Sequence, residues 1–333
     1  MAADTTVLDT LFLPFTEGQV EWRANSLFLY ADWHPALGQC DVLHIDKPAV
    51  DRLAAHGYTN LPYLDRRYDA VLIQIPKQVQ EAQGLLALAI DHLEKDGLLI
   101  VAADNDANGK RLQKWMQEAG FTEITSESKN RARVAWGRKS DSVMAPDDWA
   151  VNFAVRPLNG YFTRPGLFSW DSIDHASQLL ADNLPALSGD IADFGCGWGF
   201  LSCEALKKGT NIHSLTLIDA DSRAVTCATA NTEEIHPSAS VVPLWHDLTR
   251  PLPESVPALD TIIMNPPFHI GKKTDLDLGL SFIRTAFAQL KKGGALFMVA
   301  NAHLRYEEEL GKLFKTVELV IQKNGFKVIK AVK

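Results

Sequence analysis

The chain lacks the sequence features of several large classes of protein. It has four cysteines in 333 residues, with no C-x-x-C pair and no flanking histidine pattern, so neither a disulfide framework nor a zinc site is expected. No stretch reaches the roughly 18 apolar residues of a membrane span. The amino terminus has no basic start followed by an apolar run, so we expect a cytoplasmic protein. Positive charge is not in surplus either: the net charge of −8 argues against indiscriminate binding of nucleic acid, although a local basic face stays possible.

The order of the predicted elements indicates an α/β fold. Short apolar strands alternate with helical stretches, an order typical of β-α-β units and parallel sheets. The length suits two domains that each bury a core of their own. The stretch around 140–148 is polar and rich in turn residues. We therefore predict a first domain over 1–140, a linker over 141–155 and a second domain over 156–333.

A glycine-rich loop follows a predicted strand in the second half of the chain. The segment Asp193–Gly199 spells D-x-G-x-G-x-G, and alternate glycines let the backbone turn sharply and approach a ligand where a Cβ would clash. The spacing differs from the G-x-G-x-x-G of dinucleotide-binding folds. It resembles the S-adenosylmethionine loop of Rossmann-like methyltransferases. A glycine turn that serves only packing is the alternative interpretation.

Two carboxylates follow the next two predicted strands. Asp219 lies 20 residues beyond Gly199, at the tip of a strand, where a carboxylate can accept both hydrogen bonds of a ribose diol. In the alternative interpretation Asp219 only precedes a turn, with Asp221 as the cap of the next helix. Asp247 occupies a position where related enzymes carry a carboxylate that accepts from the adenine amino group, although exposed aspartates before loops are common.

The tetrapeptide Asn265–Phe268 ends a predicted buried strand over 259–264. Two prolines prevent the strand from continuing, so a rigid loop must follow at the carboxyl edge of the sheet, where open α/β sheets bind ligands. An exocyclic amine is a poor nucleophile because its lone pair is delocalised. The Asn265 side-chain oxygen and the Pro266 carbonyl can each accept one N–H and so aim the lone pair at a methyl donor, while Phe268 stacks on the ring. A structural Pro-Pro stop would leave Asn265 and Phe268 unexplained.

On these residues the chain resembles the bacterial ribosomal RNA guanine-N2-methyltransferases of the small-subunit type. The resemblance covers Asp193–Gly199, Asp219, Asn265–His269 and Leu290–Asn301, and extends to Gly166–Asp174 upstream and Gly325–Val328 downstream. It implies two tandem Rossmann-like class I methyltransferase domains, the first degenerate. It also implies S-adenosylmethionine as cofactor and the 2-amino group of a guanosine in 16S ribosomal RNA as methyl acceptor. Two departures are Trp198, bulkier than is usual inside the loop, and Ile270 in place of an expected polar residue.

The pattern and the resemblance together assign the site residues. Catalysis is assigned to Asn265, Pro266, Pro267 and Phe268. Cofactor binding is assigned to Asp193, Gly195, Cys196, Gly197, Gly199, Asp219, Ala220, Asp247 and Asn265, with Phe168 and Asp174 added because the family's Phe-Ser segment closes over the cofactor. Substrate binding is assigned to His269, Arg131 and Arg133. The two arginines belong to a basic cluster, Lys129–Arg133 with Arg138 and Lys139, part of which would bind RNA. No metal is expected.

The first half repeats the second half without its glycine loop. Four pairs of segments correspond: Val42–Asp46 with Leu215–Asp219, Tyr68–Lys77 with Leu259–Phe268, Leu93–Ala102 with Leu290–Val299, and Ala132–Gly137 with Phe326–Ala331. Only Gly38 follows the first strand, and Gln74 and Lys77 stand at the positions of Asn265 and Phe268. We therefore expect the first domain to keep the fold and to have lost cofactor binding, as in the family above.

Other functions stay open at this stage. The same tetrapeptide occurs in DNA adenine and protein glutamine methyltransferases, and a large-subunit guanine methyltransferase would have the same architecture. A noncatalytic RNA-binding assembly factor would suit the first domain but not the intact motifs of the second. The expected partner is ribosomal RNA within the small subunit, with the target base flipped out of its stack. No membrane is expected to take part, and a monomer is favoured.

Overall fold

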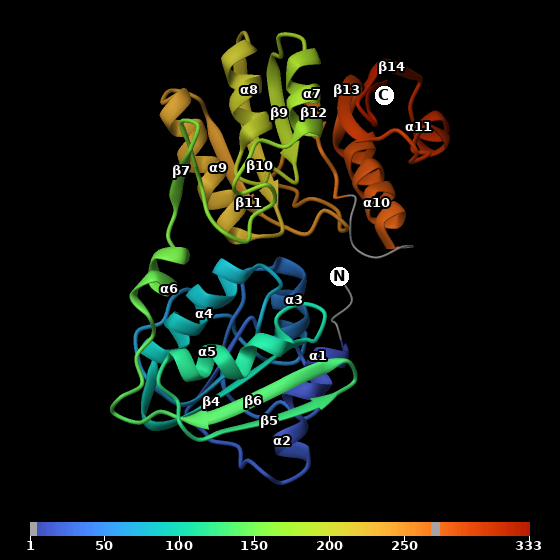
Figure 1. The fold of residues 1–333 in the computed structure, drawn as a ribbon. Helices are drawn as coiled ribbons and strands as arrows, with labels where there is room; N and C mark the ends of the chain where they lie inside the picture. Colours follow the sequence, from blue (N-terminus) through green and yellow to red (C-terminus); the bar gives the residue numbers. More distant parts are fainter. Residues whose placement is uncertain (1–4, 268–273) are drawn as a thin grey trace. The chain divides into compact units, whose positions relative to one another are not determined.

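The structure is a computed structural model that describes residues 5–267 and 274–333 (Figure 1). The chain divides into two compact units. Unit 1 comprises the chain up to Val155 together with residues 164–166, and unit 2 comprises residues 156–163 and the chain from Leu167 onward. Residues 141–155, which were predicted to form a linker, therefore cluster with unit 1. They include helix α6 (Asp147–Asn152), which packs on α4 (Val79–Asp91) and buries Trp149.

The described part of unit 1 contains a six-stranded sheet in the order β2-β1-β3-β4-β6-β5. Its first four strands are parallel, and β6 and β5 complete the sheet in antiparallel pairing. The strands are β1 (Ser26–Leu29), β2 (Asp41–Leu43), β3 (Tyr68–Gln74), β4 (Leu93–Asp104), β5 (Ile124–Lys129) and β6 (Ala132–Arg138). The remaining helices are α1 (Thr5–Leu11), α2 (Leu13–Thr16), α3 (Lys47–Ala55) and α5 (Leu112–Glu118), with a 3-10 turn, η1 (Gly109–Arg111).

Unit 2 has, in its described residues, a seven-stranded sheet in the order β11-β10-β9-β12-β13-β15-β14. Its strands are β9 (Gly189–Phe194), β10 (Ile212–Asp219), β11 (Val241–Trp245), β12 (Leu259–Met264), β13 (Leu290–Asn301), β14 (Thr316–Lys323) and β15 (Phe326–Val332). Its helices are α7 (His175–Asn183), α8 (Phe200–Lys208), α9 (Ser222–Ile235), α10 (Thr274–Gln289) and α11 (Glu307–Leu313). A hairpin, β7 (Arg156–Leu158) and β8 (Tyr161–Thr163), precedes them. The predicted α/β fold is confirmed.

The sheet of unit 2 is covered on both faces, which explains why its central strands are apolar throughout. Ile191 and Ile263 pack with α7, α8 and α9, whereas Ala192 and Ile262 pack with α10 and α11. Alternate residues of β9 and β12 thus enter opposite cores, as expected for parallel strands between two helical layers. The first five strands of the sheet are parallel, so their carboxyl ends meet at one edge. The loops at that edge carry the predicted site.

The two units share one strand order. Removing β11 from unit 2 leaves β10-β9-β12-β13-β15-β14, the counterpart of β2-β1-β3-β4-β6-β5. They also share an irregularity: the pairing jumps from Leu93 to Leu98 between β3 and β4, and from Leu290 to Ala295 between β12 and β13. An identical skip at the same place in two sheets supports the predicted duplication.

One predicted correspondence is wrong by two residues. Leu29 pairs with Leu43, and Phe194, its counterpart, pairs with Ile218. The residue that corresponds to Asp219 is therefore His44, not Asp46. Asp46 instead corresponds to Asp221, and each of these two aspartates is the N-cap residue of the following helix. A strand pattern that ends in aspartate fits Asp46, and only the hydrogen-bond register shows that His44 occupies the equivalent position.

Candidate active site

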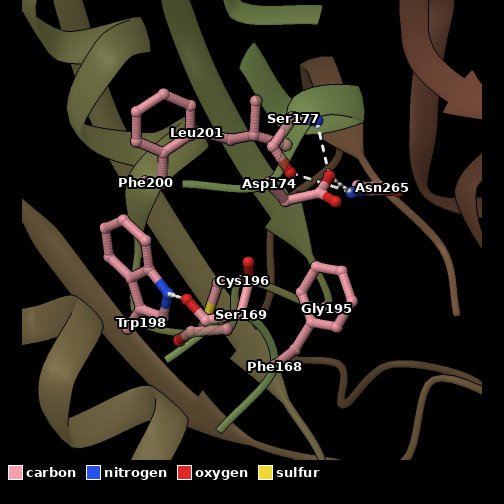
Figure 2. Close-up of a pocket in the computed structure, with 11 residues that line it drawn as sticks. Phe168, Ser169, Asp174, Ser177, Gly195, Cys196, Trp198, Phe200, Leu201 and Asn265 are labelled. Atoms are coloured by element: carbon pink, nitrogen blue, oxygen red, sulfur yellow. Dashed lines mark hydrogen bonds between the residues drawn. The ribbon is translucent and has the colours of Figure 1, made fainter. Parts of the chain in front are cut away.

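The pocket lies where the strand order of unit 2 reverses. The chain runs outward from β9 to β10 and β11 and then crosses back to β12 on the other side of β9. Such a switch point opens a crevice at the carboxyl ends of the strands. Phe194 and Met264 are paired neighbours, so Gly195 and Asn265 leave the sheet side by side. The pocket is lined by Phe168, Ser169, Asp174, Ser177, Gly195, Cys196, Gly197, Trp198, Phe200, Leu201 and Asn265 (Figure 2).

The three glycines of the loop are required for different structural reasons. All three have positive φ, of +73° at Gly195, +52° at Gly197 and +91° at Gly199. A Cβ on Gly199 would lie 2.7 Å from the Cα of Ala228, so this glycine is required for packing of α8 against α9. A Cβ on Gly197 would meet nothing within 4 Å, and one on Gly195 only Phe282 at 3.5 Å. Gly195 and Gly197 therefore leave an open cradle, while the packing interpretation holds for Gly199 alone.

Asp219, at the tip of β10, is hydrogen-bonded to the backbone of the glycine loop. Its Oδ2 accepts a hydrogen bond of 2.9 Å from the backbone N–H of Gly197, and its Oδ1 accepts one of 2.9 Å from Asp221. Asp221 also caps α9, as the alternative interpretation expected. The carboxylate is thus held at the position from which a ribose diol could be bound, although Asp219 is not among the residues that line the pocket. Its role toward a ribose stays a prediction.

Asp193 supports the loop from inside the protein and does not line the pocket. Its side chain is fully buried, and Oδ2 accepts a hydrogen bond of 2.7 Å from the hydroxyl of Ser202. Oδ1 has no partner among the described residues. Burial, reinforced by the nearby charge of Asp219, raises the pKa of Asp193 to about 7. Burial also raises the pKa of the Cys196 thiol, so that this pocket residue stays protonated.

Two predicted cofactor residues are engaged in local structure. The Oδ1 atom of Asp247 accepts hydrogen bonds from both the backbone N–H and the hydroxyl of Thr249, at 2.9 and 2.7 Å. The carbonyl of Ala220 accepts a hydrogen bond of 2.6 Å from the indole of Trp245. Neither residue lines the pocket. Contacts of Asp247 and Ala220 with a cofactor therefore remain predictions.

Asn265 is held by a clamp on α7. Its Nδ2 donates to Oδ2 of Asp174 at 3.0 Å and to Oγ of Ser177 at 2.8 Å (Figure 2). Asp174 is itself the N-cap of α7 and accepts from the backbone N–H of Ser177. The Oδ1 atom of Asn265 is buried and has no partner among the described residues. Because a carboxylate can only accept, the amide cannot turn over, and its oxygen remains available as an acceptor.

The rest of the tetrapeptide is described only in part. Pro266 is buried and Pro267 is half-buried after the end of β12, as a rigid loop requires. Phe268 and His269 lie outside the described residues, so their predicted roles in stacking and substrate binding stay predictions.

Sequence reasoning missed five residues that line the pocket: Ser169, Ser177, Trp198, Phe200 and Leu201. Ser177 and Trp198 also make hydrogen bonds that shape the site. Ser177 follows the helix cap Asp174 by three positions, and this D-x-x-S spacing could have signalled a side chain on the same side of the first helical turn. Trp198 was noted only as a bulky departure, yet its indole donates a hydrogen bond of 3.2 Å to the carbonyl of Ser169. That bond joins segments 29 residues apart in sequence, and the motif spacing does not signal it.

The predicted basic cluster is divided in the structure. Arg131 is exposed in the β5–β6 turn with a φ of +60°, and Arg133 donates to the hydroxyl of Ser128. Arg138 and Lys139 lie at and just beyond the opposite end of β6. Lys139 donates to two backbone carbonyls, and burial lowers its pKa. Within this cluster, the hairpin end with Arg131 and Arg133 stays a predicted surface for RNA.

The corresponding place in unit 1 is filled by a side chain. Tyr30 stands at the position of Gly195, with a φ of +54°, and its N–H donates to Leu43 as that of Gly195 donates to Ile218, both at 2.8 Å. The Tyr30 ring is buried, and its hydroxyl donates a hydrogen bond of 2.6 Å to Glu81. Unit 1 therefore keeps the left-handed turn of the loop but fills its cradle. This arrangement supports the expected loss of cofactor binding.

The doubly wound sheet, the glycine cradle after its central strand and the Asn-Pro-Pro sequence after the neighbouring strand define a class I methyltransferase fold. Residues 160–330 match the methyltransferase small domain family. The chain is 30% identical over 292 residues to the ribosomal RNA small subunit methyltransferase C of Shewanella pealeana, covering 86% of this chain and 83% of that protein. It is 29% identical over 306 residues to the protein of the same name from Shewanella sp. strain MR-4, covering 88% and 85%.

The chain belongs to the methyltransferase small domain family and, within it, to the ribosomal RNA small subunit methyltransferase C proteins. The family predicted from the sequence is thus confirmed. A solved structure with the same fold is the Thermus thermophilus 16S rRNA N2 G1207 methyltransferase in complex with AdoMet and guanosine. It superposes with a TM-score of 0.82 at 24% identity, covering 100% of this chain and 92% of that one. In the part of this chain that the structure describes, no helix is long and apolar enough to cross a membrane.

Proposed function

We propose that this protein transfers a methyl group from S-adenosylmethionine to the exocyclic 2-amino group of a guanosine in small-subunit ribosomal RNA. One observation carries the proposal: the Oδ1 atom of Asn265 is buried at the pocket and has no hydrogen-bond donor among the residues that the structure describes. A buried acceptor without a donor costs roughly 1–3 kcal/mol, so its retention indicates a ligand that supplies the missing N–H. The relatives named above are ribosomal RNA small subunit methyltransferases, which fits this acceptor.

The clamp on Asn265 selects a nitrogen nucleophile. Both hydrogens of its Nδ2 are donated to Asp174 and Ser177, so only the oxygen can meet a substrate. The partner must therefore be a donor, as an exocyclic amine is, and not a carbonyl or a carboxylate. The backbone carbonyl of Pro266 offers a second acceptor one residue further on. Two acceptors on one amine draw its nitrogen toward tetrahedral geometry and direct the lone pair, without a strong base, because methylation itself makes the nitrogen acidic.

The residues present fit the cofactor. Gly195 and Gly197 leave space where side chains would stand, and Asp219 holds a carboxylate at the adjoining strand tip. When bound, S-adenosylmethionine supplies a methyl group activated by a positively charged sulfur. Phe168 and Asp174, which also line the pocket, would contact it from the segment before β9. The described residues that line the pocket all belong to unit 2 of one chain, which fits a monomer.

RNA docking is assigned to unit 1. Its cradle is filled by Tyr30, and the hairpin end of β6 presents Arg131 in the open and Arg133 beside it. These cations can contact phosphates while unit 2 receives the target base. The base must leave its stack to reach the pocket, because an amine inside a paired helix is inaccessible to the donor.

The test is transfer of labelled methyl to unmodified small subunits, large subunits and free ribosomal RNA, followed by nucleoside analysis. The label is expected in N2-methylguanosine from small-subunit RNA, and Asn265→Ala should abolish this labelling. Asn183→Ala is the matched control, because Asn183 lies on α7 and donates only to the carbonyl of Leu179. Label on large-subunit RNA would show that the target guanosine lies in the large subunit. Cofactor binding without transfer to any RNA would point to DNA or protein, and absence of cofactor binding would favour an assembly factor.

A further inference from the structure

Trp198 joins the glycine loop to a segment before α7 that contributes Phe168 and Ser169 to the same pocket. This segment, residues 167–172, is called the strap. Trp198 is 4% exposed, and its ring contacts those of Tyr161 and Phe200 at centroid distances of 5.3 and 5.7 Å. Its Nε1–H donates to the carbonyl of Ser169 at 3.2 Å (Figure 2). The indole is therefore fixed on one side by aromatic packing and holds the strap on the other.

The backbone of Trp198 is fixed as well. Its carbonyl accepts a buried hydrogen bond of 2.7 Å from Nδ2 of Asn231 on α9. Asn231 in turn pairs with both the N–H and the carbonyl of Phe162. The residue thus cannot shift without breaking contacts to α9 and to β8. Trp198 is a firm anchor for whatever its indole binds.

Ser169 needs such an anchor. Its φ of +49° is left-handed, a conformation that costs a residue with a Cβ about 1–2 kcal/mol. A hydrogen bond within the strap offsets part of this backbone strain: the Ser169 hydroxyl donates to the carbonyl of Ser172 at 2.8 Å. The carbonyl of Ser169 accepts the indole bond, which ties this turn to the loop. A relaxed Ser169 would turn the chain differently and carry Phe168 with it.

Phe168 is the side chain that this arrangement presents. It is 61% exposed and yet lines the pocket, so the described residues leave most of its ring uncovered beside the site. A ligand that lies on this ring removes apolar surface from water, which favours binding. The ring is thus placed in advance of the ligand, by way of Ser169 and Trp198.

We propose that Trp198 is a positioning residue that sets cofactor affinity by holding the strap, and with it Phe168, against the glycine loop. The inference rests on the proposed function, because it takes the ligand of this pocket to be S-adenosylmethionine. It concerns a residue in which this chain departs from the small side chain usual in the loop. Trp198 acts through Phe168 and does not touch the amine that is methylated.

The test is calorimetric binding of S-adenosylhomocysteine to the full chain. Trp198→Phe keeps the packing and removes one hydrogen bond, so the dissociation constant is expected to rise about five-fold. At saturating cofactor, kcat should stay within about two-fold, which separates positioning from general damage. Trp22→Phe is the matched control, because Trp22 donates a similar indole bond of 3.1 Å to a backbone carbonyl in unit 1. Its binding should equal that of the wild type.

A double-mutant cycle tests whether Trp198 works through Phe168. Phe168→Ala alters an exposed side chain and should weaken binding while leaving the fold intact. Trp198→Phe should then add little in the Phe168→Ala background, since the wall it positions is gone. Unchanged cofactor affinity in Phe168→Ala would overturn the proposal, even if Trp198→Phe does not fold. Fully additive losses of binding free energy in the double variant would overturn it as well. A wild-type protein that fails to bind S-adenosylhomocysteine would instead contradict the proposed function.

Discussion

The side chains of Asn265 and Asp174, 91 residues apart in sequence, are joined by a hydrogen bond of 3.0 Å that decides which side of an amide faces the pocket. Asp174 also begins α7, so the same carboxylate caps a helix and orients the residue proposed to hold the amine. Helix position and catalytic geometry are therefore coupled through one oxygen, Oδ2. Substitutions that keep the cap but remove the charge can separate the two roles.

Asp174→Asn is the substitution that does so. Asparagine caps helices about as well as aspartate, so the melting temperature should change little. A neutral acceptor holds the amide of Asn265 less strongly than a charged one, by roughly 1–1.5 kcal/mol, and kcat at saturating cofactor should fall about ten-fold. Asp182→Asn removes a charge from the exposed side of the same helix and should leave kcat unchanged. Wild-type kcat in Asp174→Asn would show that the amide is oriented by other groups.

Substitutions at Gly199 and Gly197 should affect different properties, the first chiefly the stability of the fold and the second chiefly cofactor binding. Gly199→Ala places a Cβ against the backbone of Ala228, so the free energy of unfolding should fall by at least about 2 kcal/mol. Gly197→Ala meets no protein atom and should cost only about 1 kcal/mol of backbone strain. Its methyl group would nevertheless stand in the open cradle, and S-adenosylhomocysteine binding should weaken at least ten-fold, by about 1.4 kcal/mol or more. Urea unfolding and calorimetry measure the two effects.

Gly325→Ala is the control for this pair. Gly325 has a φ of +81° and open space around its Cβ position, so the substitution adds similar strain without touching the pocket. It should bind the ligand as the wild type does. Normal binding by Gly197→Ala, or a loss of binding shared by Gly325→Ala, would contradict the assignment of Gly197 to the cradle.

Asp193 should make the protein less stable as the pH rises. Its pKa is raised from 3.8 to about 7 in the folded state, so the folded protein holds a proton that the unfolded chain releases near pH 4. The contribution to stability is complete below about pH 4 and is lost as the pH rises through about 7. Asp193→Asn removes this titration. The wild-type free energy of unfolding minus that of Asp193→Asn should thus fall across pH 4–7, on the order of a few kcal/mol in total.

Measuring the difference between the two proteins is essential here. Asp190 and Asp260 have lowered pKa values, chiefly because each accepts a hydrogen bond from Lys291, and their contribution to stability changes with pH in the opposite sense. Both groups are present in the wild type and in Asp193→Asn, so their effect cancels. A difference that does not vary between pH 4 and 7 would mean that Asp193 titrates normally in the folded protein.

The parts of the site that were predictable from sequence are those fixed by local backbone chemistry. Gly195 and Gly197 stand in a left-handed turn that follows directly from their spacing, and the two prolines after Asn265 end β12 where expected. Both signals lie within a few residues and both depend on what the backbone cannot do otherwise. The class of fold followed from the same local patterns repeated along the chain.

Contacts between distant segments were not predictable in this way. The bond between Trp198 and Ser169 and the clamp of Ser177 on Asn265 form only once β9, β12 and α7 are assembled. Asp247 accepts a hydrogen bond from the hydroxyl of Thr249 beside it, a local pairing that its position after a strand does not reveal. Its predicted contact with the cofactor stays a prediction. Sequence position placed Asn265 and Asp247 after strands of the sheet without indicating their hydrogen-bond partners.

RNA docking on unit 1 can be tested by reversing charge at one end of β6. The double substitution Arg131→Glu and Arg133→Glu should raise KM for the RNA substrate, because each lost phosphate contact weakens binding and lowers the salt dependence by about one charge. Binding of S-adenosylhomocysteine should not change, since both arginines belong to unit 1 and the pocket to unit 2. Arg138→Glu, exposed at the far end of the same strand, is the control and should leave KM unaltered. An equal rise of KM in the double variant and in Arg138→Glu would indicate general electrostatic attraction. An unchanged KM and salt dependence in the double variant would show that this hairpin is not part of the RNA-binding surface.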